Sequence, residues 1–417
     1  YALGYAIVRP HARTARPAQI AGLVGAIAYA FSGYLASYPL SQLAILETVT
    51  WLPLLLLLLR TAVSRTQPLP WLLAAALTLA LSALAGHPQT FLHVSYLAAA
   101  YYLYHAIGRR WRWTWIVGLG ALLALVAVGI WTAAWLPAIR FLATTVRSDV
   151  SYQFAATGVE MLDFVQTVVP TTLGFASASY AGLATLMLAL LALLAAHGRA
   201  ATRTPNEIRF WAATAVLAAW LALGDAGILF ELVYNTAPGF ALFRQQERLL
   251  GIFCFALALL AVHGAIFWLE GDAKWRQQAL RPIAAIMVGA LALTGVILFV
   301  ASDVAARPTW PTMWIQQALL TAVILFLLWQ SPRRRWLPIL LIVILAIDLY
   351  RPALTAIERQ PGMPDRYWAQ TAWATAIPSN PPNRLDSDNR IFANVGEAFS
   401  LEDIRGISPL KPQALED

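Results

Sequence analysis

The stretch LPAIRFLATTVRSDVSYQFAATGVEMLDFVQTVVPTTLGFASASY, residues 136–180, separates two sets of apolar runs, and we expect the rest of the chain to be arranged around it. Five charged residues interrupt it too often for a hydrocarbon core: Arg140, Arg147, Asp149, Glu160 and Asp163. Six apolar residues also recur at near-helical spacing around the carboxylates of Glu160 and Asp163: Met161, Leu162, Phe164, Val165, Val168 and Val169. This pattern predicts a helix in the membrane interface with its carboxylates toward water. Two roles fit the segment equally well, a surface connector or part of a substrate site.

The overall composition indicates a polytopic membrane protein. Of the 417 residues, 59% are hydrophobic and only 12% are charged, and the mean hydropathy is +0.63. The net charge of +8 is explained better by the positive-inside rule than by nucleic-acid binding, so we expect no nucleic-acid partner. The single cysteine, Cys254, can form no internal disulfide.

Apolar runs along the chain predict an all-α protein with about eleven to twelve transmembrane helices, the first of them partial. The runs are 1–8, 17–38, 41–60, 68–86, 90–107, 114–137, 181–198, 208–224, 249–270, 282–302, 313–330 and 336–350. Because Tyr1 is not a methionine and residues 1–8 resemble the end of a helix, we expect a longer natural protein.

Basic residues orient these predicted spans. Every second connection between the predicted spans lies on the same side of the membrane, and six such connections carry 17 basic residues. The connections on the other side carry only Arg140, Arg147, Arg244, Arg248 and Arg307. The first set is therefore predicted to be cytoplasmic. Residues 138–180 and everything after the last span are then external. We expect a transmembrane domain over residues 1–350, and an external linker with the start of a soluble domain over residues 351–417, with a disordered tail as the alternative.

Several polar residues lie on the predicted external side and are candidates for binding. Glu47 is a carboxylate within an apolar run, where it needs a partner or a helix–helix hydrogen bond. The turn GHPQT places His87 and Gln89 between two spans. In FRQQER, Arg244 and Arg248 lie four residues apart, on one face if the segment is helical, and forked guanidinium donors suit a phosphate. Pairing with nearby acids or lipid headgroups is the alternative.

Common nucleotide and hydrolase motifs are missing from the sequence. There is no Walker A loop, no GxSxG elbow, no HExxH, and no GxGxxG followed by a suitable strand. ATP hydrolysis, dinucleotide chemistry and zinc proteolysis are therefore not expected.

Four segments together resemble the YfhO-like family of bacterial membrane proteins. They are residues 26–60, residues 84–104 with the GHPQ turn, residues 238–264 with the FRxxxR helix start, and SLEDIRGISPL at 400–410. The resemblance implies a GT-C type glycosyltransferase in the bacterial plasma membrane. Such an enzyme takes a sugar from a polyprenyl-phosphate carrier on the outer face and passes it to a cell-envelope acceptor.

The resemblance also assigns roles to the candidate residues. The available carboxylates are Asp163 and Glu160, one of which would accept the proton of the acceptor. Arg244, Arg248 and Arg147 would bind the phosphate, with His87, Gln89 and Glu47 in the same cavity. No cofactor is assigned, and a divalent metal ion is left open. The family's usual catalytic carboxylate is in the first external loop, and if residues 1–8 end the second span, that loop lies upstream of this sequence.

Two other functions remain open. A transporter or flippase of a lipid-linked sugar would need a similar external pocket, but usually also an internal repeat, and none is visible. A non-catalytic subunit bound to other membrane subunits would retain the fold without the chemistry. An acidic residue in an upstream external loop would favour the enzyme.

Overall fold

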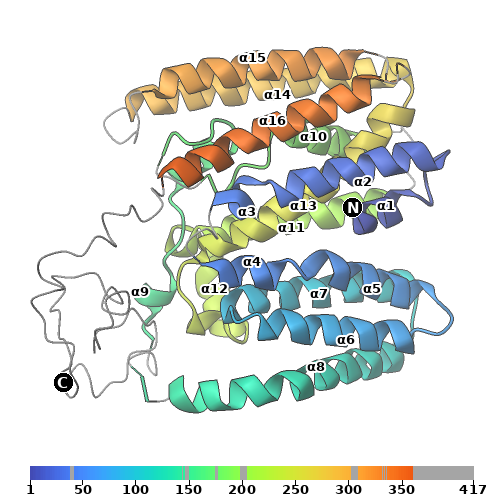
Figure 1. Ribbon diagram of the computed structural model, residues 1–417, viewed down its shortest axis with the longest axis vertical. Coiled ribbons are helices and arrows are strands. Elements are labelled where there is room, and N and C mark those ends of the chain that lie inside the picture. The colour runs from blue at the N-terminus through green and yellow to red at the C-terminus, as the bar shows by residue number, and fades with distance from the viewer. Residues whose placement is uncertain are drawn as a thin grey trace, which may run out of the picture. The chain divides into compact units, whose positions relative to one another are not determined.

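The structure is a computed structural model that describes residues 1–37, 42–142, 144–145, 150–173, 177–197, 204–301, 309–330, 332, 334 and 336–359. Within these residues, every regular element is a helix (Figure 1). The α-helices are α1 (Ala2–Val8), α2 (Ala15–Ala30), α3 (Gly33–Ser37), α4 (Leu43–Val49), α5 (Leu52–Ser64), α6 (Leu69–Leu84), α7 (Pro88–Gly108), α8 (Trp113–Leu142), α9 (Tyr152–Ala155), α10 (Leu183–His197), α11 (Pro205–Ala222), α12 (Leu229–Thr236), α13 (Leu250–Glu270), α14 (Ala273–Val300), α15 (Trp310–Trp329) and α16 (Trp336–Arg359). The 3-10 helices are η2 (Met161–Thr167), η3 (Gly224–Ala226), η4 (Phe240–Leu242) and η5 (Gln246–Leu249).

Six helical stretches of the described chain are long and apolar enough to cross a membrane, as expected of a multi-pass membrane protein. They are Leu43–Ser64, Trp113–Leu142, Gln246–Glu270, Ala273–Val300, Trp310–Trp329 and Trp336–Leu354. Leu69–Leu84 and Leu183–His197 are apolar but shorter. The larger total of eleven to twelve spans stays a prediction.

The chain divides into two compact units. The first contains residues 1–134 and 151–356, and the second contains residues 135–150 and 357–417. Most of the second unit, including the predicted external domain from residue 360 onward, lies outside the described residues. The helix α16 continues to Arg359, beyond the predicted end of the last span at Tyr350.

The first unit is built around α13, which is buried on nearly all sides and packs against α2, α10 and α11 (Figure 1). Small residues permit this packing. A Cβ atom on Gly264 would lie 1.8 Å from the carbonyl oxygen of Leu188 in α10, and one on Gly25 would lie 2.3 Å from Val262. Glycine at these contacts lets helix backbones approach closely, which is how helices associate within a bilayer.

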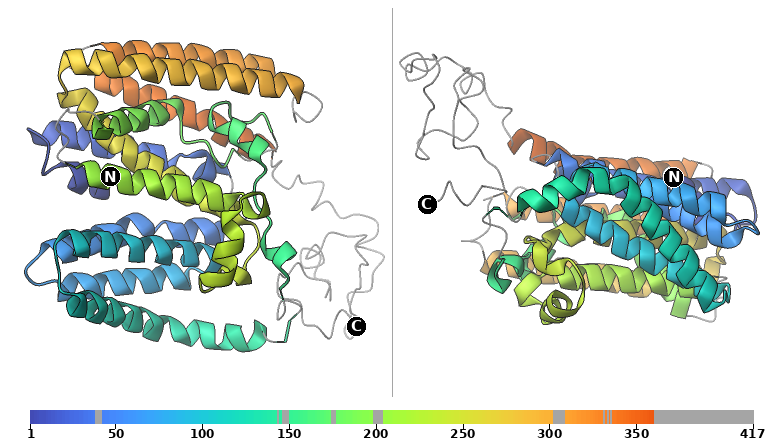
Figure 2. Two further views of the ribbon diagram at one scale, coloured as in Figure 1. Left: turned by 180° about the vertical axis from the view of Figure 1, so that it is seen from behind. Right: turned by 90° about the horizontal axis from the view of Figure 1, so that it is seen from below.

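Two further groups of helices pack around this centre. Helix α5 packs against α6 and α7, and α14 pairs with α15 (Figure 2). Helix α8 is nearly all exposed, with only Ile116 and Ala127 buried. Because this helix is strongly apolar, an exposed surface of this kind suits contact with lipid.

Several sequence predictions about helix ends need correction. The predicted span 17–38 ends as a helix at Ala30, because the chain turns at Phe31 before the short α3. The predicted span 41–60 is present as the stretch Leu43–Ser64, with a break at Thr50 between α4 and α5. The stretch 136–180 begins inside α8, so Arg140 is a helical residue. The interfacial helix predicted around Glu160 is the seven-residue 3-10 helix η2.

The later part of this stretch is a buried irregular segment that contacts several helices. The Gly33 N–H of α3 donates to the carbonyl oxygen of Tyr180 at 2.7 Å, and the Cys254 thiol of α13 lies 3.4 Å from the carbonyl oxygen of Ala178. Asp348 of α16 accepts the Leu183 N–H at 2.9 Å. Irregular backbone at this depth in a helical bundle needs such partners, since no water is there to satisfy it.

Candidate functional site

The loop before α13 positions the two candidate arginines. Gln245 has a φ of 63°, in the left-handed region, and η5 begins at the next residue. The segment is therefore not one helix, and the expectation that Arg244 and Arg248 share a helical face is wrong. Instead, the left-handed residue between them directs the two side chains to different neighbours.

Arg248 lies in a cluster of glutamines. Its Nη1 donates to Oε1 of Gln89, and its Nη2 donates to Oε1 of Gln42 at 3.0 Å and of Gln245 at 2.8 Å. Gln89 in turn donates to the carbonyl oxygen of Gln245 at 3.3 Å. The cluster thus joins the first turn of α7, the chain before α4 and the loop before α13.

The charge of Arg248 is not balanced within this cluster. All three partners are neutral amide oxygens, and the buried Nε atom has no hydrogen-bond partner. The one ion pair among the described residues joins Arg60 to Glu207. A half-buried guanidinium without a carboxylate keeps its positive field for a ligand, because amide dipoles orient it but do not neutralise it.

His87 lies at the N-terminal end of α7 beside this cluster. Gly86, with a φ of 94°, makes the turn, and the Nδ1 atom of His87 accepts the Thr90 N–H at 3.1 Å. The backbone N–H of His87 donates to Oγ1 of Thr48 at 3.3 Å. Burial, and to a smaller extent the charge of Arg248, lowers the pKa of His87 to about 4. The imidazole is therefore neutral at pH 7, and it acts as a helix cap.

Arg244 is exposed and lies over an aromatic ring. Its guanidinium carbon is 5.1 Å from the ring centroid of Phe154, a cation–π contact. Phe154 belongs to α9, which packs against η4 just before Arg244. The arginine is thus fixed on the side of α9 rather than among the glutamines.

The remaining predicted residues have different surroundings. Glu47 is exposed on α4, and no hydrogen bond or ion pair joins it to Arg248. Asp163 accepts the Glu160 N–H at 3.0 Å and so caps η2, whereas Glu160 is exposed. Arg147 lies outside the described residues. The structure therefore brings together His87, Gln89 and Arg248.

Beside α7 there is an apolar cavity of about 610 Å³, lined by residues of α5, α6, α7 and α8. On α7 its lining runs from Phe91 to Leu103, and the only hydroxyl groups along it, those of Ser95 and Tyr102, donate to backbone oxygens within the protein. Apart from the indole rings of Trp113 and Trp131, the other lining side chains are aliphatic or phenyl groups, so the cavity suits a hydrocarbon chain.

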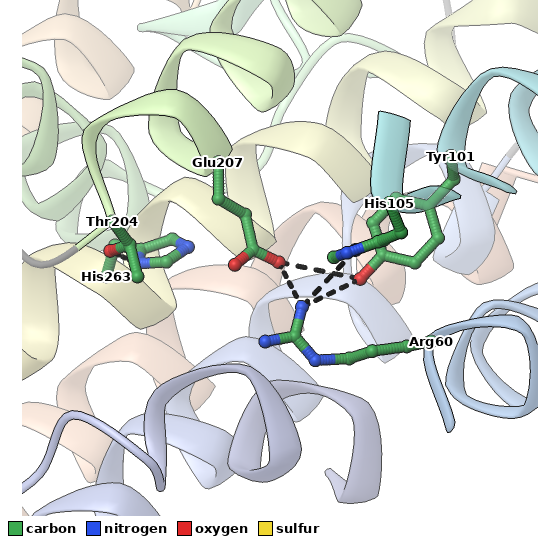
Figure 3. A network of polar contacts seen from close by, with 6 residues as sticks. All are labelled: Arg60, Tyr101, His105, Thr204, Glu207 and His263. Carbon is green, nitrogen blue, oxygen red and sulfur yellow. Dashed lines mark hydrogen bonds and ion pairs between the residues drawn. The ribbon is translucent and has the colours of Figure 1, made fainter. Parts of the chain in front are cut away.

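A second polar network joins α5, α7 and α11 (Figure 3). Nη1 of Arg60 donates to Oε1 of Glu207 at 2.6 Å and to the Tyr101 hydroxyl at 3.3 Å, and it lies 3.4 Å from Nε2 of His105. Glu207 is 5% exposed. The sequence analysis did not pair Arg60 with Glu207, because they are 147 residues apart.

Asp348 is a third polar site that the sequence analysis missed. It accepts the Tyr180 hydroxyl and the Leu183 N–H, and only 2% of its surface is exposed. A carboxylate within the apolar run IVILAIDLY is the signal that could have revealed it. With its backbone and hydroxyl donors, Asp348 serves as a cap for α10, which explains its burial.

No metal centre is present in the part of the chain that the structure describes: no three His, Cys, Asp or Glu side chains are grouped to hold an ion. The divalent metal that was left open is therefore not given a site by these residues. Comparison of the chain with protein-family models, curated proteins and solved structures finds no match.

Proposed function

We propose that this chain is the membrane domain of a glycosyltransferase, which takes a sugar from a polyprenyl-phosphate carrier and transfers it to a cell-envelope acceptor. The observation that carries the proposal is Arg248, a half-buried cation held by three glutamines with no carboxylate partner among the described residues. Phosphate oxygens match the forked donors of a guanidinium. His87 is neutral beside it, so Arg248 supplies the charge.

The carrier lipid has a hydrocarbon chain as well as a phosphate. The cavity beside α7 begins at Phe91, two residues after Gln89 of the glutamine cluster. Its lining residues on α7, from Phe91 to Leu103, are separated by twelve steps of helix, about 18 Å at the usual rise. An apolar chain could therefore occupy the cavity while the phosphate of the same lipid contacts the cluster.

The transfer step needs an acid–base residue near the phosphate. In this reaction the acceptor hydroxyl oxygen attacks the anomeric carbon, the bond from that carbon to the phosphate oxygen breaks, and the phosphate leaves with the bonding electrons. A carboxylate takes the acceptor proton, and Arg248 stabilises the leaving phosphate.

Of the two candidate bases, Glu160 is the more exposed. Both carboxylates take part in the capping box of η2. The nearby Thr157 carbonyl accepts the Gln246 N–H at 2.7 Å, next to the arginine loop. Three residues of chain span at most about 10 Å, so the backbone of Glu160 stays within that distance of Thr157.

Binding of a polyprenyl-phosphate sugar to the purified protein in detergent tests the proposal. We expect Arg248→Ala to weaken binding about ten- to hundredfold, because charge-assisted hydrogen bonds contribute roughly 1.5–3 kcal/mol. Arg248→Lys should recover only part of the loss, because an ammonium group lacks the fork. Arg209→Ala, at an exposed arginine of α11, is the matched control.

Equal affinity of wild type and Arg248→Ala would refute the proposed phosphate site. Transfer is measured separately, with the full-length protein, because a lipid-linked sugar transporter would bind the same phosphate. Binding without transfer by the full-length protein would favour the transporter, and no binding at all would favour a non-catalytic subunit.

A further inference from the structure

Near the arginine loop, two half-buried tyrosines and an exposed acid lie together. The hydroxyl of Tyr152 in α9 donates to Oδ1 of Asp225 in η3 at 3.0 Å. Its ring packs edge-to-face with that of Tyr234 in α12, with centroids 5.1 Å apart and planes at 88°. Neither tyrosine is buried, and Asp225 is exposed. We call Tyr152, Tyr234 and Asp225 the tyrosine platform.

The platform is held rigidly by backbone contacts. The Asp225 N–H donates to the Ala156 carbonyl at 2.8 Å, and the Val159 N–H donates to the Ala222 carbonyl at 2.9 Å. A Cβ atom at Gly224 would lie 2.1 Å from the Ala156 oxygen, so the two chain segments are in direct contact. Since the supporting backbone is fixed on two sides, the rings are presented in one arrangement and little ordering is needed on binding.

One residue connects the platform to the phosphate-binding cluster. The Gln245 backbone N–H donates to Oγ1 of Thr157, in the same segment as Tyr152, at 2.9 Å. Oε1 of Gln245 accepts from Arg248 at 2.8 Å. Arg244, the residue before it, lies over Phe154 of α9. The loop at Gln245 is therefore bonded both to the segment that follows Tyr152 and to Arg248.

This combination has a characteristic ligand chemistry. The C–H face of a hexose ring packs on an aromatic face, and its hydroxyl groups bond to carboxylates and guanidinium groups. The buried Phe230 lies 6.3 Å from each ring, centroid to centroid, and an edge-to-face pair leaves other ring faces that its members do not cover. A simple anchoring role would be served as well by buried rings, and these rings are partly open to solvent.

We infer that the tyrosine platform binds a hexose ring, with Tyr152 or Tyr234 under the ring and Asp225 on its hydroxyl groups. This inference rests on the proposed function, because it names the part of the same site that recognises sugar. The ring could belong to the lipid-linked donor or to a carbohydrate acceptor, and both present the same chemistry to the platform.

The test compares two ligands, polyprenyl phosphate and the same lipid carrying a hexose. We expect the hexose to tighten binding to wild type about three- to tenfold. Tyr152→Ala should abolish this gain in affinity from the hexose and leave the affinity for polyprenyl phosphate unchanged. Tyr152→Phe, which keeps the ring, should retain most of it. Tyr350→Ala, at a tyrosine of α16 that is 56% exposed, is the control and should behave as wild type.

If the hexose tightens binding to Tyr152→Ala and Tyr234→Ala as much as to wild type, the platform does not bind the sugar of the lipid-linked donor. The acceptor arm uses methyl hexosides, observed by saturation-transfer NMR. Hexoside binding that the tyrosine variants abolish would assign the platform to an acceptor, and the inference fails if neither arm responds to them. Lack of polyprenyl phosphate binding by wild type would instead overturn the proposed function, and the hexosides alone would then decide the platform. Thermal unfolding of each variant separates loss of binding from loss of fold.

Discussion

The buried ion pair between Arg60 and Glu207 leads to an asymmetric prediction about stability. We consider Glu207→Met and Arg60→Met, which replace each charge by an apolar side chain of similar length. The two groups lie 2.6 Å apart, and the side chain of Arg60 is 18% exposed while that of Glu207 is 6% exposed. Loss of one partner leaves the other charge in a poorly hydrated site, which costs several kcal/mol.

The two losses differ because only one partner can become neutral. Without Arg60, the carboxyl group of Glu207 can take up a proton. Without Glu207, the guanidinium of Arg60 stays charged, since it does not lose its proton in proteins. We expect Glu207→Met to cost about 3 kcal/mol, the lower end for a broken buried pair, because the arginine can still extend its stem toward water. Arg60→Met should cost about 1–2 kcal/mol.

Equilibrium unfolding in mixed detergent micelles, followed by circular dichroism, measures these free energies. The double variant should cost less than Glu207→Met alone, because an apolar pair carries no stranded charge. Arg209→Met, at an exposed position on the same helix, should change stability by less than about 0.5 kcal/mol. The reasoning is refuted if Arg60→Met is the more costly single change, or if the double variant costs the sum of the two.

Three other predictions follow from the site and the fold. Between about pH 6.5 and pH 4 the unfolded chain binds a proton at His87 that the folded protein does not. The free energy of unfolding should therefore fall by roughly 2–3 kcal/mol on acidification over this range, and by less in His87→Asn. Equilibrium unfolding measured at a series of pH values checks this. Gly33→Ala would place Cβ 2.0 Å from the carbonyl oxygen of Ser177, so we expect a loss of about 1–3 kcal/mol in thermal unfolding, against almost none for Gly108→Ala. Asp163→Ala should cost about 1 kcal/mol by removing the cap of η2, and hydrogen exchange at the Glu160 amide should accelerate while exchange in α13 stays unchanged.

Much of the architecture could be predicted from the sequence because hydrophobicity is a local signal. Long apolar runs gave the helical class and most of the helices, including Trp113–Leu142 and Ala273–Val300. Helix ends were less accurate. The break at Phe31 occurs between apolar residues, and Tyr180 there accepts the Gly33 N–H from a distant part of the chain. No local pattern reports such a contact.

The site was predicted in part for the same reason. His87, Gln89 and Arg248 were expected together because each lies between two apolar runs on the same predicted side. The partners Gln42 and Gln245 were missed, since a glutamine has no charge to mark it as exceptional. Pairs far apart in sequence, such as Arg60 with Glu207, depend on how the helices pack, and a single sequence does not contain that information.

Gln245 is the residue at which these observations meet. An ordinary helical conformation there would have placed Arg244 and Arg248 one turn apart, with their like charges on one face. The left-handed conformation instead leaves one arginine among amide oxygens and the other on the ring of Phe154. Such a conformation costs about 1–3 kcal/mol for a residue other than glycine, and it persists here because the Gln245 backbone and side chain both have partners. A strained residue between two cations on one loop fits the proposed site, with a phosphate at Arg248 and a sugar at the tyrosine platform.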